Sequence, residues 1–116
     1  MEPVNLAEKL EQFDAQWQPH VVAEYNGNDI MVAKFQGAFP FHDHPDTDDL
    51  FLVLEGEVLL DVEDATHRLG PGELFVVPAG VKHRPRAETE AKVMLIEPAG
   101  TPNTGDAATA VVKPRI

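Results

Sequence analysis

Short apolar runs separated by turn residues limit the fold of this chain more than any other feature. From His20 onward, runs rich in Val, Ile, Leu and Phe last only a few residues before Gly, Pro, Asn or Asp interrupts them. Such runs are typical of antiparallel strands in a sandwich or barrel, and they leave no room for helices between the strands. The sequence therefore predicts an all-β fold.

The turn residues between the runs give the bounds of the predicted strands. Asn26-Gly27 predicts a hairpin with a type I′ turn, since both central positions of that turn need positive φ. Gly56 predicts a second hairpin in the same way. The strands that we expect cover residues 20–25, 30–35, 50–54, 58–62, 74–77, 81–86 and 93–97.

A short helix is expected before the first strand. Asn5 and Glu8 have the spacing of a capping box, in which each side chain bonds a backbone N–H at the start of a helix. Leu6 and Phe13 lie two helical turns apart and belong to one apolar stripe. We therefore predict a helix over 5–14 whose apolar stripe packs on a sheet.

The chain has 116 residues, which is enough for one domain with its own core. We expect an N-terminal helix and lead-in over 1–18, a β-barrel over 19–100 and a C-terminal loop or tail over 101–116. Turn formers dominate from Pro98 onward, so the last residues are expected as an edge strand or a loose tail.

Composition excludes some kinds of chemistry and disfavours some partners. There is no Cys, so disulfides, thiolate ligands and thiol catalysis are excluded. The formal net charge of −11 disfavours nucleic acid and anionic membrane surfaces. The N-terminus has no basic region followed by an apolar run, and the longest apolar stretch, 50–54, is far shorter than a membrane span. A cytoplasmic protein is expected.

Three histidines and one aspartate form the candidate site. His42 and His44 are two residues apart, so their side chains share one face of an extended strand. Asp49 follows after a turn-like segment, and His83 lies on a later predicted strand. Three imidazoles and a carboxylate suit Fe, Mn, Ni, Zn or Cu and leave positions for water or substrate.

Glycines and a proline surround these four residues in two patterns. The first pattern consists of a glycine, the sequence His-x-His, an acidic residue and, after six further residues, a second glycine. The second pattern consists of a glycine, then five residues, the sequence Pro-x-Gly, two more residues and a histidine. The positions are Gly37, His42, His44, Asp49 and Gly56 in the first pattern and Gly72, Pro78, Gly80 and His83 in the second. In these two motifs the chain resembles compact single-domain bacterial cupins. Residues 97–106 also look like a stretch found in a group of short bacterial cupins without assigned function.

The resemblance implies a double-stranded β-helix, or jelly-roll, barrel with one divalent transition metal bound inside it and a homodimer as the assembly. The metal ligands that it implies are His42, His44, Asp49 and His83. Asp49 stands where the usual ligand is a glutamate, one methylene longer, so Asp48 or a water is an alternative fourth ligand. Gly37 is also one residue closer to His42 than is usual, and the asparagine that commonly ends the second motif is Ala87 here.

Three functions are compatible with this reading. The first is a metal-dependent enzyme of the dioxygenase or isomerase type acting on a small oxygen-rich metabolite. The second is a non-catalytic module that binds a metal or a small ligand, and the third is a metal-free structural cupin. The sequence identifies no general base, because Glu55, Glu57, Glu73 and Tyr25 cannot be placed against a substrate.

Several other polar residues are expected on the surface. His20 and His67 are interpreted as surface histidines. Lys82, Arg84 and Arg86 alternate with His83, so if His83 points inward they point outward. We expect them to pair with surface acids or with a second subunit.

The aromatic residues are expected to fill the barrel. Phe39, Phe41, Phe51 and Phe75 are predicted core residues. Trp17 is expected to be a packing anchor at the junction of helix and barrel or part of a dimer seam. A pocket lined by such side chains would prefer a small, partly apolar ligand.

Overall fold

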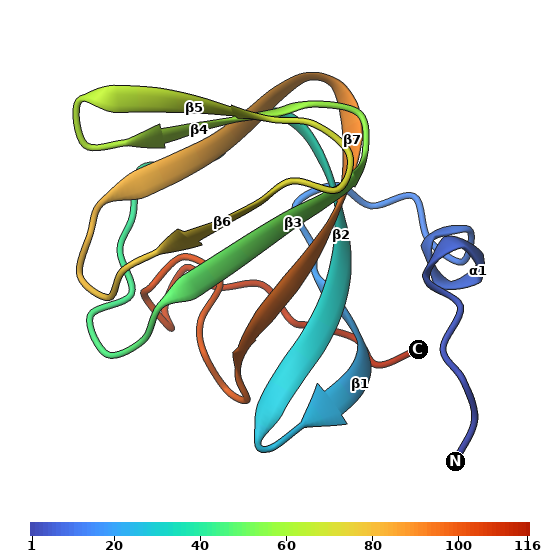
Figure 1. Cartoon of the computed structure of the whole chain (residues 1–116). Helices are drawn as coiled ribbons and strands as arrows, with labels where there is room; N and C mark the ends of the chain where they lie inside the picture. The colour runs from blue at the N-terminus through green and yellow to red at the C-terminus, as the bar shows by residue number, and fades with distance from the viewer.

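All residues from Met1 to Ile116 are described by the computed structural model, in which one short helix precedes a seven-stranded antiparallel sheet (Figure 1). The elements are α1 (Leu6–Leu10), β1 (His20–Tyr25), β2 (Asn28–Ala38), β3 (Asp49–Glu55), β4 (Val58–Val62), β5 (Ala65–Leu69), β6 (Leu74–Val77) and β7 (His83–Pro98). The predicted all-β cupin fold with a short N-terminal helix is confirmed.

Strand β7 connects the two parts of the sheet. Its first residues, 83–86, pair with β4, whereas residues 92–96 pair with β3. Strand β2 pairs with β7 along most of its length. Figure 1 shows β7 curving from the layer that contains β4 and β5 into the layer that contains β2 and β3. The sheet therefore folds over itself and encloses a core.

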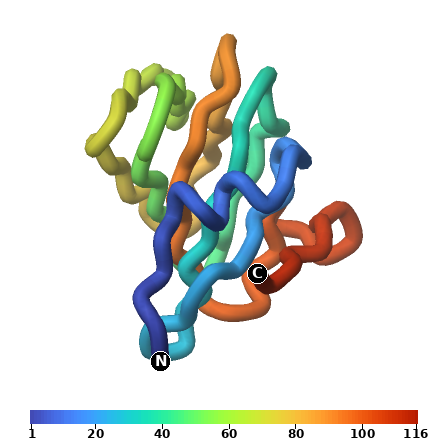
Figure 2. Tube along the Cα trace, turned by 90° about the vertical axis from the view of Figure 1, so that its right-hand side faces the viewer, coloured from blue at the N-terminus to red at the C-terminus, as the bar shows by residue number.

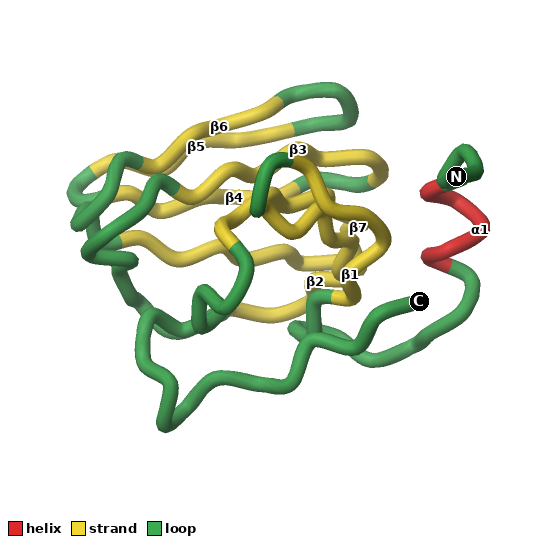
Figure 3. The backbone as a smooth tube through the Cα atoms, turned by 90° about the horizontal axis from the view of Figure 1, so that it is seen from below, coloured by secondary structure: helices red, strands yellow, loops and turns green.

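The core lies between these two layers. Met31, Val53, Leu60 and Val93 are fully buried and come from β2, β3, β4 and β7 respectively. In β3 and in both halves of β7, buried residues alternate with half-buried ones, as expected for strands with one face toward a core. Figure 3 shows the layers from below, with the loops gathered along one side.

The N-terminal segment covers part of the outer face of the sheet. Leu10 packs with Val22 and Val32 in a second, smaller apolar cluster, joined by Leu6 and Phe13. Figure 2 shows this segment crossing the strands on their outer side. The predicted role of the apolar stripe, to cover a sheet, is confirmed.

The helix is shorter than predicted. Asn5 caps it as expected by accepting a hydrogen bond from the Glu8 N–H at 3.0 Å, but the helix ends at Leu10 and not at residue 14. Phe13 leaves the helix because its ring stacks on His20 at 3.7 Å between centroids. His20 is consequently buried, and the prediction of a surface histidine there is wrong.

One of the two predicted hairpins forms. Asn26 and Gly27 have φ of 49° and 78° and join β1 to β2, as a type I′ turn requires. Strands β3 and β4 do not pair with each other: β3 pairs with β6 and β7, and β4 with β5 and β7. The predicted hairpin at Gly56 is therefore wrong.

The reason lies in the surroundings of Gly56. Its φ is +83°, and a Cβ there would lie 3.1 Å from the Cα of Ala91 in β7. The chain passes close over β7 at this point and continues into the other layer. Glycine is needed here both for the positive φ and for the close approach of two backbones.

Two further strand bounds differ from the prediction. The predicted strands 81–86 and 93–97 are parts of the single strand β7, which begins only at His83, because pairing with β2 continues past the exposed polar residues between them. Strand β5 was not predicted, since its sequence is polar and mostly exposed. Both errors arise because pairing with neighbouring strands, and not local apolarity, determines that these residues are in a strand.

The C-terminal residues return to the first strand. Val21 and Arg115 form an isolated parallel bridge, and the N–H of Ile116 donates to the carbonyl of Val21 at 3.0 Å. No helix in the structure has the length and apolar character needed to cross a membrane. The homodimer implied by the resemblance stays a prediction.

The replacement Gly56→Ala is expected to destabilise the fold more than Gly27→Ala. Both positions have positive φ, which costs an L residue about 1–2 kcal/mol. Only at Gly56 does the added Cβ also meet a neighbouring backbone, and such overpacking costs about 1–3 kcal/mol more. Urea unfolding of both variants measures the difference. Equal losses would contradict the role assigned to the contact with Ala91.

Candidate metal centre

Two backbone hydrogen bonds bring the two predicted motifs together. The His42 N–H donates to the His83 carbonyl at 3.0 Å, and the His83 N–H donates to the His42 carbonyl at 2.9 Å. A third bond runs from the Gly80 N–H to the His44 carbonyl at 2.9 Å. The segment that carries His-x-His is thereby fixed against the start of β7.

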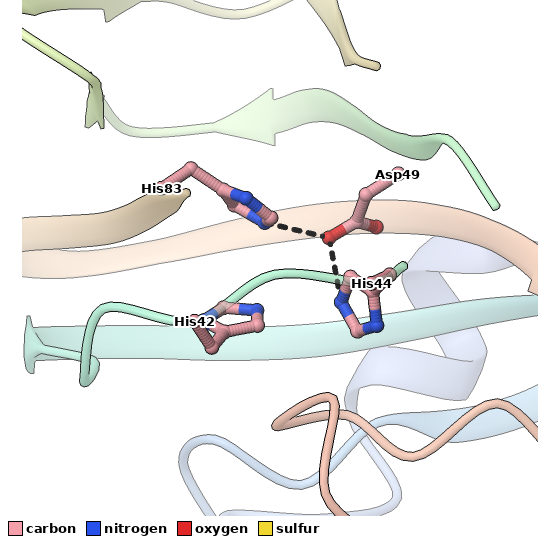
Figure 4. Close-up of side chains that lie close together, drawn as sticks. All are labelled: His42, His44, Asp49 and His83. Carbon is pink, nitrogen blue, oxygen red and sulfur yellow. Dashed lines mark hydrogen bonds and ion pairs between the residues drawn. The ribbon is translucent and has the colours of Figure 1, made fainter. Parts of the chain in front are cut away.

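The four predicted ligands lie in one buried cluster (Figure 4). One ligand atom from each of His42, His44, Asp49 and His83 lies within 4.8 Å of all the others. Asp49, His44 and His83 are buried, and His42 is half-buried. Figure 4 shows the imidazoles of His44 and His83 on either side of the Asp49 carboxylate.

Asp49 reaches the cluster although it is shorter than glutamate. Its Oδ2 lies 3.0 Å from His83 Nε2 and 3.3 Å from His44 Nε2. Asp48 points elsewhere, because its Oδ1 accepts a hydrogen bond from the Ala79 N–H at 2.9 Å. Of the two candidate carboxylates, the structure therefore places Asp49 in the cluster.

Backbone carbonyls fix the protonation of two imidazoles. His42 Nδ1 lies 2.9 Å from the Pro40 carbonyl, and His83 Nδ1 lies 2.9 Å from the Val81 carbonyl. A carbonyl oxygen only accepts, so Nδ1 carries the hydrogen in both rings and a neutral ring keeps its lone pair on Nε2. Metal-binding histidines typically donate from one ring nitrogen to a carbonyl or carboxylate in this way and bind the metal with the other.

The spacing of the ligand atoms fits a single ion. Nitrogen and oxygen ligands bind first-row metals at about 2.1 Å, so two ligands of one ion are at most about 4.2 Å apart. The cluster, whose ligand atoms lie within 4.8 Å of one another, needs a contraction of only a few tenths of an ångström. His42, His44, Asp49 and His83 therefore suit one metal ion by geometry and by ligand type.

Glu97 is a further member of the site that the sequence reasoning missed. It ends the inward-facing row of β7, with a carboxylate that is only 4 % exposed. Its Oε2 lies 3.9 Å from His44 Nε2, and its Oε1 lies 3.5 Å from the Nζ of Lys113 in the C-terminal tail. The alternation of Val93, Leu95 and Glu97 on one face of a strand was the signal that would have found it.

Three buried polar atoms of the site have no hydrogen-bond partner: His44 Nδ1, Asp49 Oδ1 and Glu97 Oε2. Buried carboxylate oxygens are costly without a partner, at about 1–3 kcal/mol or more each. Two of them in one site indicate that a cation or a hydrogen-bond donor belongs beside them.

The pKa values of the cluster are shifted in opposite directions. Burial lowers the pKa of His42, and the Pro40 carbonyl only partly opposes it. Burial also works against the charged form of His44, but the hydrogen bond and negative charge of Asp49 outweigh it and raise the pKa. Asp49 is buried as well, yet hydrogen bonds from His44 and His83 keep its pKa below the usual value.

The pKa of Glu97 is shifted in the opposite direction to that of Asp49. Burial, with the negative charge of Asp49 in addition, raises the pKa of Glu97 to about 7. Lys113 and His44 oppose this rise without cancelling it. The pocket thus holds two carboxyl groups of different proton affinity.

A small cavity of about 30 Å³ adjoins the cluster and shares Trp17, Phe39, His42 and Asn103 with a larger hollow of about 710 Å³. Its polar lining comes from His42, Asp49, Glu97 and Asn103, and its aromatic lining from Trp17, Phe35, Phe39 and Phe51. Trp17 stacks on Phe35 at 4.3 Å between centroids and donates its indole N–H to the Gln36 carbonyl. The small cavity has mainly apolar walls, and only the larger hollow beside it has the size of a small-molecule site.

The other candidate residues lie outside this site. Arg84 and Arg86 both bind the Asp61 carboxylate, which is buried, so their partner is not the surface acid that was predicted. The hydrogen bond from Arg86, above all, holds the pKa of Asp61 far below its usual range. His67 is half-buried against the Phe75 ring, and Phe41, a predicted core residue, is about half exposed beneath Arg84.

The fold and the buried cluster define a cupin domain. Residues 30–97 match the family described as Cupin domain, and the chain belongs to that family.

The chain is similar to several bacterial proteins. It is 36 % identical over 77 residues to the uncharacterised protein YdbB of Bacillus subtilis, covering 66 % of this chain and 68 % of that one. A cupin-2 domain protein of Shewanella frigidimarina has 40 % identity and a TM-score of 0.81 over 82 % of this chain and 93 % of its own. Protein NMB1881 of Neisseria meningitidis has 31 % identity and a TM-score of 0.77 over 84 % of this chain and 100 % of its own.

The metal-free protein is expected to lose stability as the pH rises from 4.5 to 8. The pKa of Glu97 is about 7 in the folded state against 4.5 when exposed, so the folded state binds more protons in this window. A shift of this size corresponds to about 3 kcal/mol. The raised pKa of His44 acts in the same direction, because its stabilisation is lost as the pH rises through that pKa. The lowered pKa of His42 acts in the opposite direction and offsets part of the loss.

Urea unfolding in the presence of a chelator measures this change. Glu97→Gln is expected to remove most of the pH dependence. Glu55→Gln is the matched control, because Glu55 pairs with Lys92 on the surface of the same sheet. An identical pH profile for the wild type and Glu97→Gln would refute the assignment.

Proposed function

We propose that this protein binds one divalent transition metal through His42, His44, Asp49 and His83, and that it acts on a small oxygen-rich molecule held in the adjoining cavity. The reaction type that this site suits is that of a metal-dependent dioxygenase or isomerase. The ion would supply Lewis-acid polarisation of a bound oxygen pair.

One contact supports the metal site more than any other. His83 Nε2 lies 3.0 Å from Asp49 Oδ2, while His83 Nδ1 already donates its hydrogen to the Val81 carbonyl. In a neutral ring, two lone pairs would therefore face each other at this distance in a buried place. A positive charge between the two atoms, a proton or a metal ion, removes the repulsion.

The chain's own residues have separate tasks in this proposal. The carbonyls of Pro40 and Val81 orient His42 and His83 so that each Nε2 faces the ion. Trp17 and Phe39, whose tilted rings lie 5.1 Å apart between centroids, form an apolar wall that excludes water. Water exclusion strengthens the electrostatic interactions inside the cavity.

A non-catalytic module that binds a metal or small ligand is the second candidate. It uses the same cluster and cavity and differs only in the absence of turnover. A metal-free structural cupin is the third, and the unpartnered Asp49 Oδ1 and Glu97 Oε2 count against it.

Elemental analysis of protein purified without a His-tag tests the metal site. Near-stoichiometric Fe, Mn, Ni, Zn or Cu is expected in the wild type and is expected to be lost in His42→Ala/His44→Ala. His67→Ala, which removes a histidine outside the cluster, should keep the metal. No metal in the wild type after incubation with each ion would refute the proposal.

Metal affinity is expected to fall steeply below about pH 6. Ligation needs neutral imidazole, and Asp49 raises the pKa of His44 above 6.5, so the ion competes with a proton there. Each competing proton lowers the affinity about tenfold per pH unit. Titration calorimetry at pH 7.5 and pH 5 measures the change, and equal affinity at both would contradict histidine ligation.

Turnover separates the enzyme from the binding module. The metal-loaded protein is assayed for product formation and O₂ consumption on a panel of diketones, keto-acids and sugar phosphates. Turnover that disappears in His42→Ala/His44→Ala supports the enzyme. Binding of a panel member without turnover supports the module.

A further inference from the structure

The carboxylate of Glu97 is the feature of the cavity that neither metal ligation nor packing explains. Its side chain is 4 % exposed, and its Oε2 has no partner in the protein. A buried carboxylate oxygen without a partner is rare, because its desolvation is not compensated. Since Glu97 lines the cavity beside the metal cluster, its missing partner belongs to what the cavity binds.

The other oxygen of Glu97 is already engaged. Lys113 Nζ lies 3.5 Å from Oε1 and also donates to the carbonyl of Thr101. The ammonium is thus fixed by the tail itself and holds one side of the carboxylate. Oε2 is left as an acceptor with a defined position.

The tail that carries Lys113 is tied to the metal cluster. A Cβ at Gly105 would overlap the carbonyl oxygen of Asp43, the residue between His42 and His44. Asn103, from the same tail, lines the cavity. Residues 101–116 therefore form one wall of the site, and glycine at 105 permits this approach.

The distance to the cluster decides what Oε2 can contact. It lies 3.9 Å from His44 Nε2, so a molecule bound beside the ion has an atom within reach of Oε2. The opposite walls are the rings of Trp17, Phe39 and Phe51. The cavity beside the cluster is only about 30 Å³, so a ligand that fits places its apolar ring or chain in the larger hollow beside Trp17 and Phe39. It directs an oxygen toward the cluster and a donor hydrogen toward Glu97.

We propose that Glu97 is a specificity-determining residue of the cavity, which accepts a hydrogen bond from an O–H of a small, mainly apolar ligand, and that Lys113 is its positioning residue. The inference rests on the proposed metal site. It names the ligand class as neutral molecules with adjacent oxygens, at least one of them a hydroxyl. A ligand that presents a carboxylate to Glu97 is rejected by like charge.

The test compares two probe ligands on the Co²⁺-loaded protein. Catechol has two adjacent hydroxyls, and 2-methoxyphenol lacks one donor hydrogen. In the wild type, catechol is expected to bind at least about tenfold more tightly, because a hydrogen bond to a charged acceptor is lost with the methyl ether. The visible spectrum of Co²⁺ reports binding of both.

Variants at Glu97 and Lys113 distinguish the contribution of this hydrogen bond from the contribution of metal chelation. Glu97→Gln is expected to reduce the ratio of the two dissociation constants below about threefold, and Lys113→Met to reduce it partly. Glu55→Gln, in the exposed ion pair with Lys92, should keep the wild-type ratio. Co²⁺ affinity should stay within about threefold in all variants, which also shows that they fold.

Each remaining outcome contradicts a different part of the proposal. An unchanged ratio in Glu97→Gln makes Glu97 structural and overturns the inference alone. A tenfold loss of Co²⁺ affinity in Glu97→Gln makes Glu97 a metal ligand and also overturns it. Failure of the wild type to bind catechol overturns the ligand class, whereas failure to bind Co²⁺ overturns the proposed function and this inference with it.

Discussion

The reciprocal pair of backbone hydrogen bonds between His42 and His83 is the constraint on which the site depends. It joins the His-x-His segment, which belongs to no long strand, to the first residue of β7. Side-chain hydrogen bonds alone would leave the two segments free to move apart. Because the backbones are paired, the imidazoles of both segments approach a common point, and strand β3 adds Asp49 from its first residue.

Because the site is buried, its charged groups need compensating partners, and the chain supplies only some of them. Asp49 is stabilised as a carboxylate by His44 and His83, whereas Glu97 is not, and burial raises its pKa to about 7. Lys113 supplies one positive charge at the far side of Glu97. The remaining unpartnered oxygens face the cluster and the cavity, so compensation must come from bound species. This physical argument favours a binding site over an inert scaffold.

The sequence predicted those parts of the fold and site that depend on local spacing. Alternation placed His42 and His44 on one face, and turn chemistry located Asn26 and Gly27 at positive φ. The hairpin at Gly56 was predicted wrongly because its glycine serves a close approach to Ala91, which is distant in sequence. The alternation of side chains along the strand could have predicted that Glu97 faces the site. It could not have predicted Lys113, because only the folding of the tail brings Lys113 near Glu97.

The metal cluster and the specificity group are held by different parts of the chain. The four cluster residues sit on the His-x-His segment, β3 and the start of β7, where backbone pairing fixes them. Glu97 lies at the opposite end of β7 and depends on a lysine from a segment without regular strands. Lys113 lies beyond Gly105, where the tail contacts the His-x-His segment, so in the proposed function a change at Lys113 alters which ligand the cavity accepts and leaves the cluster in place. In that proposal the barrel keeps its metal chemistry while its ligand varies.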